Sequence, residues 1–371
     1  MKEKIWLSSP HLTGEEQKYI NEAFKTNWVA PLGPNVNGFE QDICKYTGAK
    51  SCSALSSGTA AIHLALILLG VAEGDEVLCS SFTFSATANP IAYQKAIPVF
   101  IDSERDTWNM DPVLLEQAIK DRVANGQKPK AILVVHLYGM PAKIEEIMAV
   151  ADAYDIPVIE DAAEAIGSLY KGKALGTFAN IGVFSFNGNK IITTSGGGAL
   201  ISDTPELCQQ ATFLATQARD AAPHYQHSHI GYNYRMSNIV AGIGRGQMEV
   251  LNDRVEARRR VFEIYKEELS DIKAISFVEE PEGYYSNRWL TTILTDSYDK
   301  REELRLALEV ENIESRPLWK PMHLQPVFEK YPSYTNGVSE DLFDRGLCLP
   351  SGSNMTDADI QRVITKIKEI F

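Results

Sequence analysis

Basic side chains are scarce in this sequence. Its 371 residues include 36 lysines and arginines against 49 aspartates and glutamates, which gives a formal net charge of -13 at pH 7. Proteins whose main partner is a nucleic acid carry basic patches, so this balance argues against such a partner. It still allows an anionic ligand, because backbone amides and hydroxyl groups can bind a phosphate.

Long apolar runs are also missing. The longest, residues 60–72, contains His63 and is too short to span a bilayer. The first four residues, Met-Lys-Glu-Lys, do not begin the apolar core of a signal peptide. We therefore expect a cytoplasmic protein with no membrane partner.

Closely spaced cysteines are absent as well. The five cysteines are scattered through the chain at Cys44, Cys52, Cys79, Cys208 and Cys348. An odd and scattered set is typical of a reducing compartment and lacks the spacing of metal ligands. A histidine cluster at residues 224–229 has no further ligands beside it, so we expect no metal.

The chain is longer than a single core usually supports, so a large and a smaller domain are expected. We place an N-terminal arm and the large domain in residues 1–250 and the small domain in residues 251–371. Short apolar runs predict strands at 51–55, 76–79, 97–101, 131–135, 157–160, 181–186 and 198–202. Helical patterns at 59–69, 83–94, 112–124 and 143–154 lie between several of them. This alternation predicts an α/β fold with a mostly parallel sheet covered on both faces.

The pattern changes towards the C-terminus. One long helix is predicted from about residue 238 to about 269, and the charged run 254–260 inside it is typical of a solvated helix face. Beyond it, the sequence predicts a strand at 288–295, a helix at 300–311 and a closing helix at 357–371.

A lysine and an aspartate follow two of the predicted strands. Lys190 lies four residues after the strand at 181–186, and Asp161 ends the apolar run that begins at residue 156. An amine in such a place can form a Schiff base with the aldehyde of pyridoxal phosphate (PLP). A carboxylate can keep the pyridine nitrogen of PLP protonated, which makes the ring an electron sink. The pair therefore predicts PLP chemistry.

A third element supports this interpretation. Ser57, Gly58 and Thr59 join a predicted strand to a predicted helix. Amides at a helix N-terminus, together with hydroxyl groups, can bind a phosphate. The same residues could equally serve only as a helix cap.

Six motifs extend over nearly the whole chain: Ala-Pro-Leu-Gly at 30–33, Ser-Gly-Thr-Ala at 57–60, Ile-Glu-Asp-Ala-Ala-Glu at 159–164, Ser-Phe-Asn-Gly-Asn-Lys at 185–190, Gly-Tyr-Asn-Tyr-Arg-Met at 231–236 and Arg-Pro-Leu-Trp at 316–319. With these motifs the chain resembles the DegT/DnrJ/EryC1/StrS family of PLP-dependent sugar aminotransferases. The resemblance implies an aspartate-aminotransferase-like (type I) PLP fold with a smaller C-terminal α+β domain. Within the family, the chain most resembles enzymes that aminate carbon 4 of UDP-4-keto-6-deoxy-N-acetylglucosamine.

The resemblance also implies roles for individual residues. Lys190 and Asp161 would be the catalytic pair, with Lys190 moving the proton once it is freed from the cofactor. The implied cofactor-binding set is Ser57, Gly58, Thr59, Phe84, Asp161, Glu164, Ser185, Asn187, Lys190 and Asn233. Phe84 would stack on the cofactor ring, although an aromatic there could also be part of the core. Glu164 stands where many members of the family have glutamine or histidine. Asn233 would reach the phosphate in the neighbouring subunit, which implies a homodimer with shared active sites.

The implied substrate-binding set is Asn27, Trp28, Ala30, Arg219, Arg235, Trp319, Lys320 and His323. The two arginines are candidates for the carboxylates of the amino donor, L-glutamate, and either could equally form a structural ion pair. The tryptophans could equally be packing residues.

The resemblance implies transfer of the amino group of L-glutamate to a UDP-linked 4-keto-6-deoxy-N-acetylhexosamine, for a bacterial surface glycan or glycoprotein sugar. The alternatives are a GDP- or dTDP-linked keto-sugar, a PLP-dependent sugar dehydratase, or a non-catalytic regulator. Related dehydratases carry histidine in place of the lysine, which disfavours the second alternative. A regulator would need a DNA-binding or partner module, and no helix-turn-helix segment or basic patch stands out.

Overall fold

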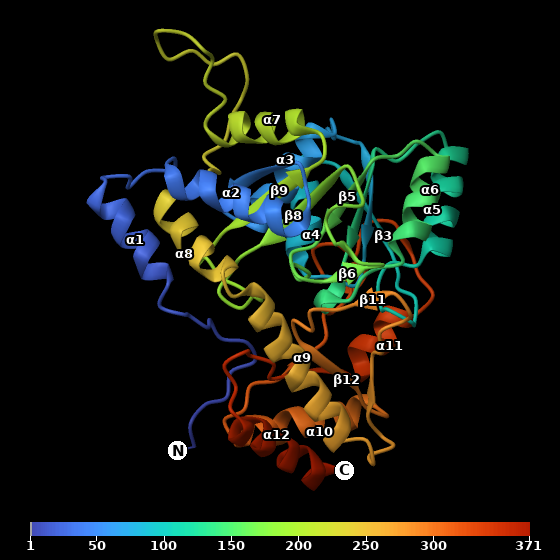
Figure 1. Ribbon diagram of the computed structural model, residues 1–371. Helices are drawn as coiled ribbons and strands as arrows, with labels where there is room; N and C mark the ends of the chain where they lie inside the picture. Colours follow the sequence, from blue (N-terminus) through green and yellow to red (C-terminus); the bar gives the residue numbers. More distant parts are fainter. Residues whose placement is uncertain (1) are drawn as a thin grey trace.

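The computed structural model describes residues 2–371 and is built around an eight-stranded sheet (Figure 1). The strands occur in the order β1 (Ser51–Leu55), β9 (Gly198–Ser202), β8 (Ile181–Ser185), β5 (Val158–Asp161), β4 (Ala131–Val135), β2 (Glu76–Ser80), β3 (Ile97–Ile101) and β14 (Ser333–Tyr334). Only the pairs that β9 forms with β1 and β8 are antiparallel. The predicted α/β architecture with a mostly parallel sheet is confirmed.

Helices cover both faces of this sheet, as its doubly buried strands require. On one face lie α2 (Pro34–Thr47), α5 (Pro112–Ala124) and α6 (Ile144–Ala153), and on the other α3 (Gly58–Leu68), α4 (Ser85–Tyr93) and α7 (Pro205–Ala215). Alternate residues of β4 belong to different cores: Ile132 and Val134 pack on the first face, and Leu133 packs on the second. Successive side chains of a strand point to opposite faces of the sheet, so one apolar run contributes to both cores.

Strand direction determines where a site can form. The strands β1, β2, β4, β5 and β8 all run the same way, because β1 and β8 are both antiparallel to β9. Their carboxyl ends consequently meet at one edge of the sheet, where open α/β sheets bind ligands. Asp161, Ser185 and the Ser57 turn all reach this edge.

The C-terminal part has its own core. A four-stranded antiparallel sheet has the order β10 (Ser276–Phe277), β12 (Thr291–Leu294), β15 (Gly346–Leu349) and β13 (Arg316–Pro317). The helices of this part are α9 (Leu251–Glu268), α10 (Tyr298–Val310), α11 (Val338–Arg345) and α12 (Asp357–Ile370). Tyr265, Ile293, Leu304 and Ile364 are buried together in this core.

Three segments cross the expected division at residue 250. Ile5, from the N-terminal arm, forms a bridge with Ile313 and is buried in the C-terminal core. In the other direction, β14 pairs with β3 of the large sheet. A small sheet of β11 (Tyr284–Tyr285), β6 (Leu169–Tyr170) and β7 (Lys173–Ala174) also joins the two parts.

The single long helix predicted after residue 237 is wrong. The chain forms two helices there, α8 (Asn238–Met248) and α9, with Glu249 and Val250 between them. Helix α8 packs against α1 (Glu16–Lys25). The apolar pattern runs through the break, so it could not reveal where one helix ends and the next begins.

The interpretation of the run 254–260 as a solvated face holds at Glu256 and Arg260, which are exposed, but is wrong at Arg258. Arg258 is only 1% exposed, and its guanidinium donates to the backbone carbonyls of Trp289 and Ser351. Arg259 forms an ion pair with Glu280. Acceptors supplied by other parts of the chain made burial possible, and the local pattern carries no sign of them.

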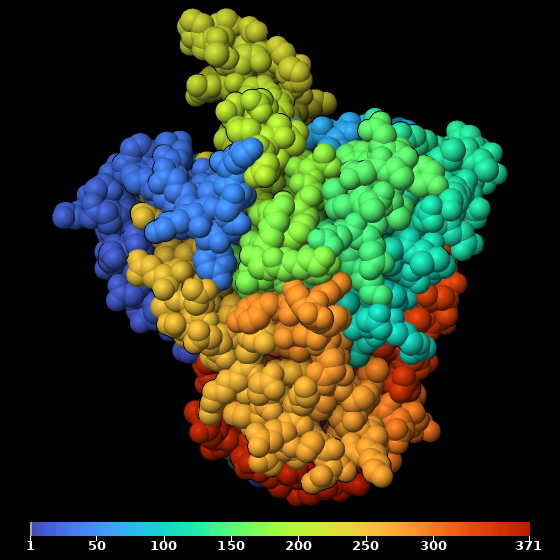
Figure 2. Space-filling model, turned by 45° about the vertical axis from the view of Figure 1, so that its right-hand side comes forward, coloured from blue at the N-terminus to red at the C-terminus, as the bar shows by residue number. Residues whose placement is uncertain are grey.

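The segment between α7 and α8 projects from the body of the molecule (Figures 1 and 2). It contains the exposed side chains of Tyr225 and Ile230. Among the helices formed by residues 2–371, none combines the length and the apolar character needed to cross a membrane.

Candidate active site

A cavity of about 290 Å³ opens at the carboxyl edge of the large sheet. It lies at the lower end of the range for small-molecule pockets. Its lining comprises Ser57, Gly58, Thr59, Ile62, Thr83, Phe84, Ala86, Thr87, Val135, Asp161, Ala163, Glu164, Ser185, Asn187, Asn189, Lys190, Gly196, Gly197, Trp289 and Trp319. Nine of the ten residues of the predicted cofactor-binding set are among these, and Asn233 is the exception.

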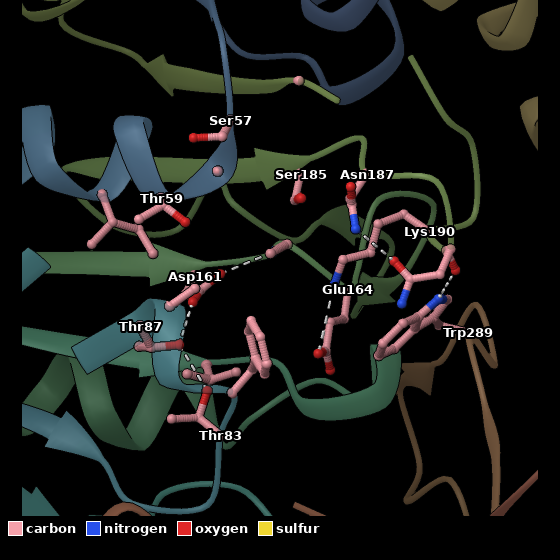
Figure 3. Close-up of a pocket in the computed structure, with 18 of the residues that line it drawn as sticks. Ser57, Thr59, Thr83, Thr87, Asp161, Glu164, Ser185, Asn187, Lys190 and Trp289 are labelled. Carbon is pink, nitrogen blue, oxygen red and sulfur yellow. Dashed lines mark hydrogen bonds and ion pairs between the residues drawn. The ribbon is translucent and has the colours of Figure 1, made fainter. Parts of the chain in front are cut away.

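Asp161 lies at one end of the cavity, where β5 ends (Figure 3). The Thr87 hydroxyl donates to its Oδ2 at 2.7 Å, and the Ala163 amide donates to its Oδ1 at 3.1 Å. Thr83 Oγ1 lies 2.8 Å from Thr87 Oγ1 and can donate to it in turn. Burial raises the pKa of Asp161, and the donors at Thr87 and Ala163 oppose that rise. The carboxylate is thus buried without being left unsatisfied.

Lys190 extends into the cavity from the turn after β8 (Figure 3). Its side chain is 13% exposed, and its Nζ lies 3.6 Å from Glu164 Oε1. The same nitrogen is 4.2 Å from the centroid of the Trp289 ring. The amine is therefore inside the cavity, between a carboxylate and an indole face.

Glu164 is the second buried carboxyl group in the cavity. The Tyr138 amide donates to its Oε2 at 2.7 Å. Tyr138 adopts a φ of 53°, which costs a residue with a Cβ about 1–2 kcal/mol. Burial raises the pKa of Glu164, and the Lys190 ammonium is the largest influence that opposes this rise. The pKa of Glu164 is therefore linked to the charge on Lys190.

The N-terminus of α3 borders the cavity at Ser57, Gly58 and Thr59. The side chain of Ser57 caps the helix and accepts from the Ala60 amide at 3.0 Å. A Cβ at Gly58 would lie 3.0 Å from the Cβ of Ser185, and one at Gly198 would lie 2.3 Å from the backbone carbon of Ser57. The Ser57–Gly58 backbone lies this close to Ser185 and to Gly198 because neither glycine carries a Cβ. Amides, hydroxyl groups and the helix dipole therefore converge on one place, which fits the phosphate of PLP.

Aromatic rings line the side of the cavity that faces the C-terminal part. The ring centroids of Phe84 and Trp319 are 5.2 Å apart, and Tyr138 lies nearly parallel to both Trp319 and Trp289. Phe84 is 52% exposed, so it is not a core residue. A flat ring such as pyridine would find aromatic faces here.

Most residues of the predicted substrate-binding set lie outside this cavity. Only Trp319 lines it. Arg235 forms an ion pair with Glu40, the structural alternative that its sequence left open. His323 is held between Ser81, at 2.6 Å, and Glu340, at 3.2 Å.

The remaining members of that set point elsewhere. Arg219 is exposed and lies over the Tyr225 ring in the projecting segment. Asn27 and Trp28 are exposed at the turn between α1 and α2, Ala30 is partly buried there, and Lys320 is not part of the cavity lining. Asn233, of the cofactor set, is likewise exposed beside the projecting segment. Within one chain, these residues are not brought to Lys190.

The structure adds cavity residues that the sequence did not single out. Thr83 and Thr87 flank Phe84 in sequence, and their spacing of four places both hydroxyls on one side of the start of α4. That spacing is a signal that could have been used. Trp289 also lines the cavity, whereas Tyr138 lies outside the lining and donates to Glu164 through its amide. Neither offered such a signal, because they approach Lys190 and Glu164 from distant parts of the chain. No group of three or more His, Cys, Asp or Glu suited to a metal occurs in residues 2–371.

The sequence and the structure both have well-matched relatives. The sequence model of the DegT/DnrJ/EryC1/StrS aminotransferase family matches residues 10–368. The chain is 56% identical to EpsN of Bacillus subtilis (strain 168), named as a pyridoxal phosphate-dependent aminotransferase, over 100% of this chain and 97% of EpsN. It is 38% identical to GDP-perosamine synthase of Escherichia coli O157:H7, over 99% of this chain and 98% of that protein.

Among solved structures, a DegT DnrJ EryC1 StrS aminotransferase from Brucella abortus is similar, with a TM-score of 0.90 and 32% identity over 96% of this chain and 95% of that one. The PLP form of the sugar aminotransferase Spr1654 from Streptococcus pneumoniae has a TM-score of 0.91 and 25% identity, over 100% of both chains.

Proposed function

The chain belongs to the DegT/DnrJ/EryC1/StrS aminotransferase family and is a PLP-dependent aminotransferase, and on this premise we propose that it moves the amino group of L-glutamate to carbon 4 of a nucleotide-linked 4-keto-sugar. The observation that carries the proposal is the convergence of Lys190, Asp161 and the α3 N-terminus on one cavity. These three elements supply the amine, the carboxylate and the anion site that the chemistry needs.

PLP, when bound, supplies the electron sink that lets an amino group leave one carbon and join another. Asp161, at the end of β5, would accept a hydrogen bond from the protonated ring nitrogen. Ser57, Gly58, Thr59 and Ser185 would bind the phosphate. Lys190 would hold the cofactor through its Nζ and, once released, its amine would take up the α proton of the donor and give it back as an acid. The same amine would carry out the reverse proton transfer on the sugar, so one lysine would serve both halves of the reaction.

Two substrates are candidates. The resemblance of residues 185–198 and 316–323 to enzymes for UDP-linked sugars favours a UDP-linked 4-keto-6-deoxy-N-acetylhexosamine. The relatives named GDP-perosamine synthase, at 35–38% identity, favour a GDP-linked sugar as the second candidate. A site that hydrogen-bonds the acetamido group should reject sugars that lack it strongly.

A competition experiment separates the two candidates. Purified enzyme with L-glutamate is given UDP-, GDP- and dTDP-linked 4-keto-6-deoxy sugars, and kcat/KM is measured for each. The UDP proposal expects the UDP-linked N-acetylhexosamine to be preferred by at least about a hundredfold. A preference for the GDP-linked sugar would overturn that substrate and leave the reaction type standing. A PLP absorbance band that does not change when L-glutamate is added would contradict L-glutamate as the amino donor.

We further propose a homodimer in which Asn233 completes the partner's phosphate site. The supporting observations are the exposure of Asn233, the projecting segment beside it and the exposed apolar residues Trp28, Val29 and Leu32 at the α1–α2 turn. A two-fold interface would give two equal sites.

Mixing two inactive variants tests this arrangement. Lys190→Ala and Asn233→Asp subunits should together recover about a quarter of the wild-type sites, because half of the randomly mixed dimers carry one intact site out of two. Each variant alone, treated identically, is the control. If subunits shown to exchange recover no activity while Asn233→Asp alone is inactive, each site is complete within one chain.

A further inference from the structure

The amine of Lys190 has two immediate neighbours that differ in kind. Glu164 Oε1 lies 3.6 Å from Nζ and can carry a negative charge. The Trp289 ring lies 4.2 Å from Nζ, within the range in which an aromatic face attracts a cation (Figure 3). Asp161 lies at the other end of the cavity, so the two neighbours hold the amine on the side away from it.

Trp289 is fixed in place from several directions. It is 1% exposed, and its indole N–H donates to the Asn189 carbonyl at 2.7 Å. Its own amide donates to Asn287 Oδ1 at 2.9 Å. A ring held at its edge and at its backbone cannot turn away from the amine without breaking these bonds.

Arg258 explains why Trp289 and the Lys190 segment stay together. Its guanidinium donates to the Trp289 carbonyl at 2.6 Å, to Ser8 Oγ at 2.9 Å and to the Lys190 carbonyl at 3.5 Å. Ser8 Oγ donates in turn to the Asn189 carbonyl at 2.6 Å. The short turn that carries Lys190 is thus bound from three places: by Ser8 of the N-terminal arm, by Arg258 of α9 and by Trp289 just before β12.

We infer that Trp289 is a positioning residue for Lys190: its indole face holds the amine beside Glu164 once that amine has left the cofactor and taken up a proton. The role given to Lys190 rests on the proposed function. A lysine that repeatedly leaves the cofactor and returns needs a defined place for its freed ammonium group. A buried ring face stabilises an ammonium without accepting its proton, unlike a carboxylate. The ring therefore stabilises the charged amine without competing for the proton that the amine must deliver.

Fluorinated tryptophan tests the ring face directly. Fluorine withdraws electron density from the face and weakens cation binding, while the indole N–H and the shape of the ring remain. The enzyme is produced with tryptophan, monofluoro- or difluorotryptophan and loaded with pyridoxamine phosphate, which leaves Lys190 free. The rate of acetylation of Lys190 by limiting acetic anhydride is then followed by peptide mass spectrometry. We expect this rate to rise about two- to fivefold along the series.

Other lysines provide internal controls. Lys171 and Lys173 lie over Tyr170 and Phe178, so fluorination of tryptophan should not change their acetylation. Lys4 lies over Trp6 and should respond in the same direction as Lys190. Trp289→Phe is the matched variant: it keeps a ring that cannot be fluorinated, and it should abolish the response of Lys190 while leaving that of Lys4.

Two results would overturn the inference. One is an acetylation rate of Lys190 that does not depend on fluorination in the wild-type chain. The other is a dependence that persists in Trp289→Phe, which would assign the effect to another tryptophan. Neither result concerns whether Lys190 bonds the cofactor. That question is decided separately by the absorbance of the PLP-loaded enzyme, so failure of the inference and failure of the proposed function are distinguishable.

Discussion

The two buried carboxyl groups of the cavity are only three residues apart in sequence, yet they are stabilised differently. Asp161 is 4% exposed and accepts hydrogen bonds from the Thr87 hydroxyl and the Ala163 amide. Glu164 is 6% exposed and accepts one hydrogen bond, from the Tyr138 amide. Its other neighbour is the Lys190 amine. Burial raises both pKa values. The first carboxylate is stabilised mainly by neutral donors and the second mainly by a charged one.

This difference assigns the two ends of the cavity different tasks. Neutral donors do not change with protonation, and the donors at Thr87 and Ala163 lower the pKa of Asp161 more than the charge on Lys190 does. For Glu164 the order is reversed, because Lys190 is the largest influence that lowers its pKa. The charge on Asp161 is therefore less sensitive to the protonation of Lys190 than the charge on Glu164.

The largest effect on rate is expected when the negative charge of Asp161 is removed. Asp161→Asn keeps the shape but cannot carry a charge to balance a protonated ring nitrogen. We expect the single-turnover rate with L-glutamate to fall about 10²- to 10⁴-fold. Cofactor content, measured by absorbance, is the control. A fully loaded variant that loses less than tenfold would show that this carboxylate is not the essential one.

A smaller effect on rate is expected when Asp161 loses the hydrogen bond from the Thr87 hydroxyl. Thr87→Val removes the hydroxyl and leaves the size unchanged, which should reduce the rate about tenfold or somewhat more. A donor to the ionised form lowers the pKa of Asp161, so its loss raises that pKa further and moves the acidic limb of the pH–rate profile to higher pH.

Thr83→Val is the graded control, since its hydroxyl is one hydrogen bond further from the carboxylate. We expect it to shift the acidic limb in the same direction by less. Equal effects from the two variants would argue that the shift comes from packing of the α4 start rather than from donation to Asp161.

The smallest effect on rate is expected when Glu164 is changed. Glu164→Gln should change turnover by less than about tenfold, because Lys190 and Trp289 remain. Its stability effect has a defined sign. A carboxyl group whose folded pKa is raised favours folding below its unfolded pKa, and this contribution is lost as the pH rises through the folded pKa. Without cofactor, the variant should therefore gain Tm relative to wild type, and gain more at pH 8 than at pH 4.5. A larger gain at the lower pH would contradict the sign.

The sequence alone predicts the parts of this site that are local. Lys190, Asp161 and Ser57–Gly58–Thr59 each follow a strand within a few residues, so apolar runs were enough to locate them. Trp289 was not found because it meets the Lys190 turn through a bond to Asn189, 100 positions away in the chain. Arg258 was judged solvated because arginine-rich helices usually are, whereas three backbone carbonyls from other segments surround it here. Contacts of this kind depend on the assembled fold, and no local pattern records them.

The central claim is that Lys190 is the amine that bonds the cofactor. The most direct measurement is borohydride reduction of the PLP-loaded enzyme, followed by proteolysis and mass spectrometry of the peptides. The account predicts a single pyridoxyl adduct on the peptide that contains Lys190, and its loss in Lys190→Ala. An adduct on Lys171 or Lys173, with Lys190 unmodified, would contradict it.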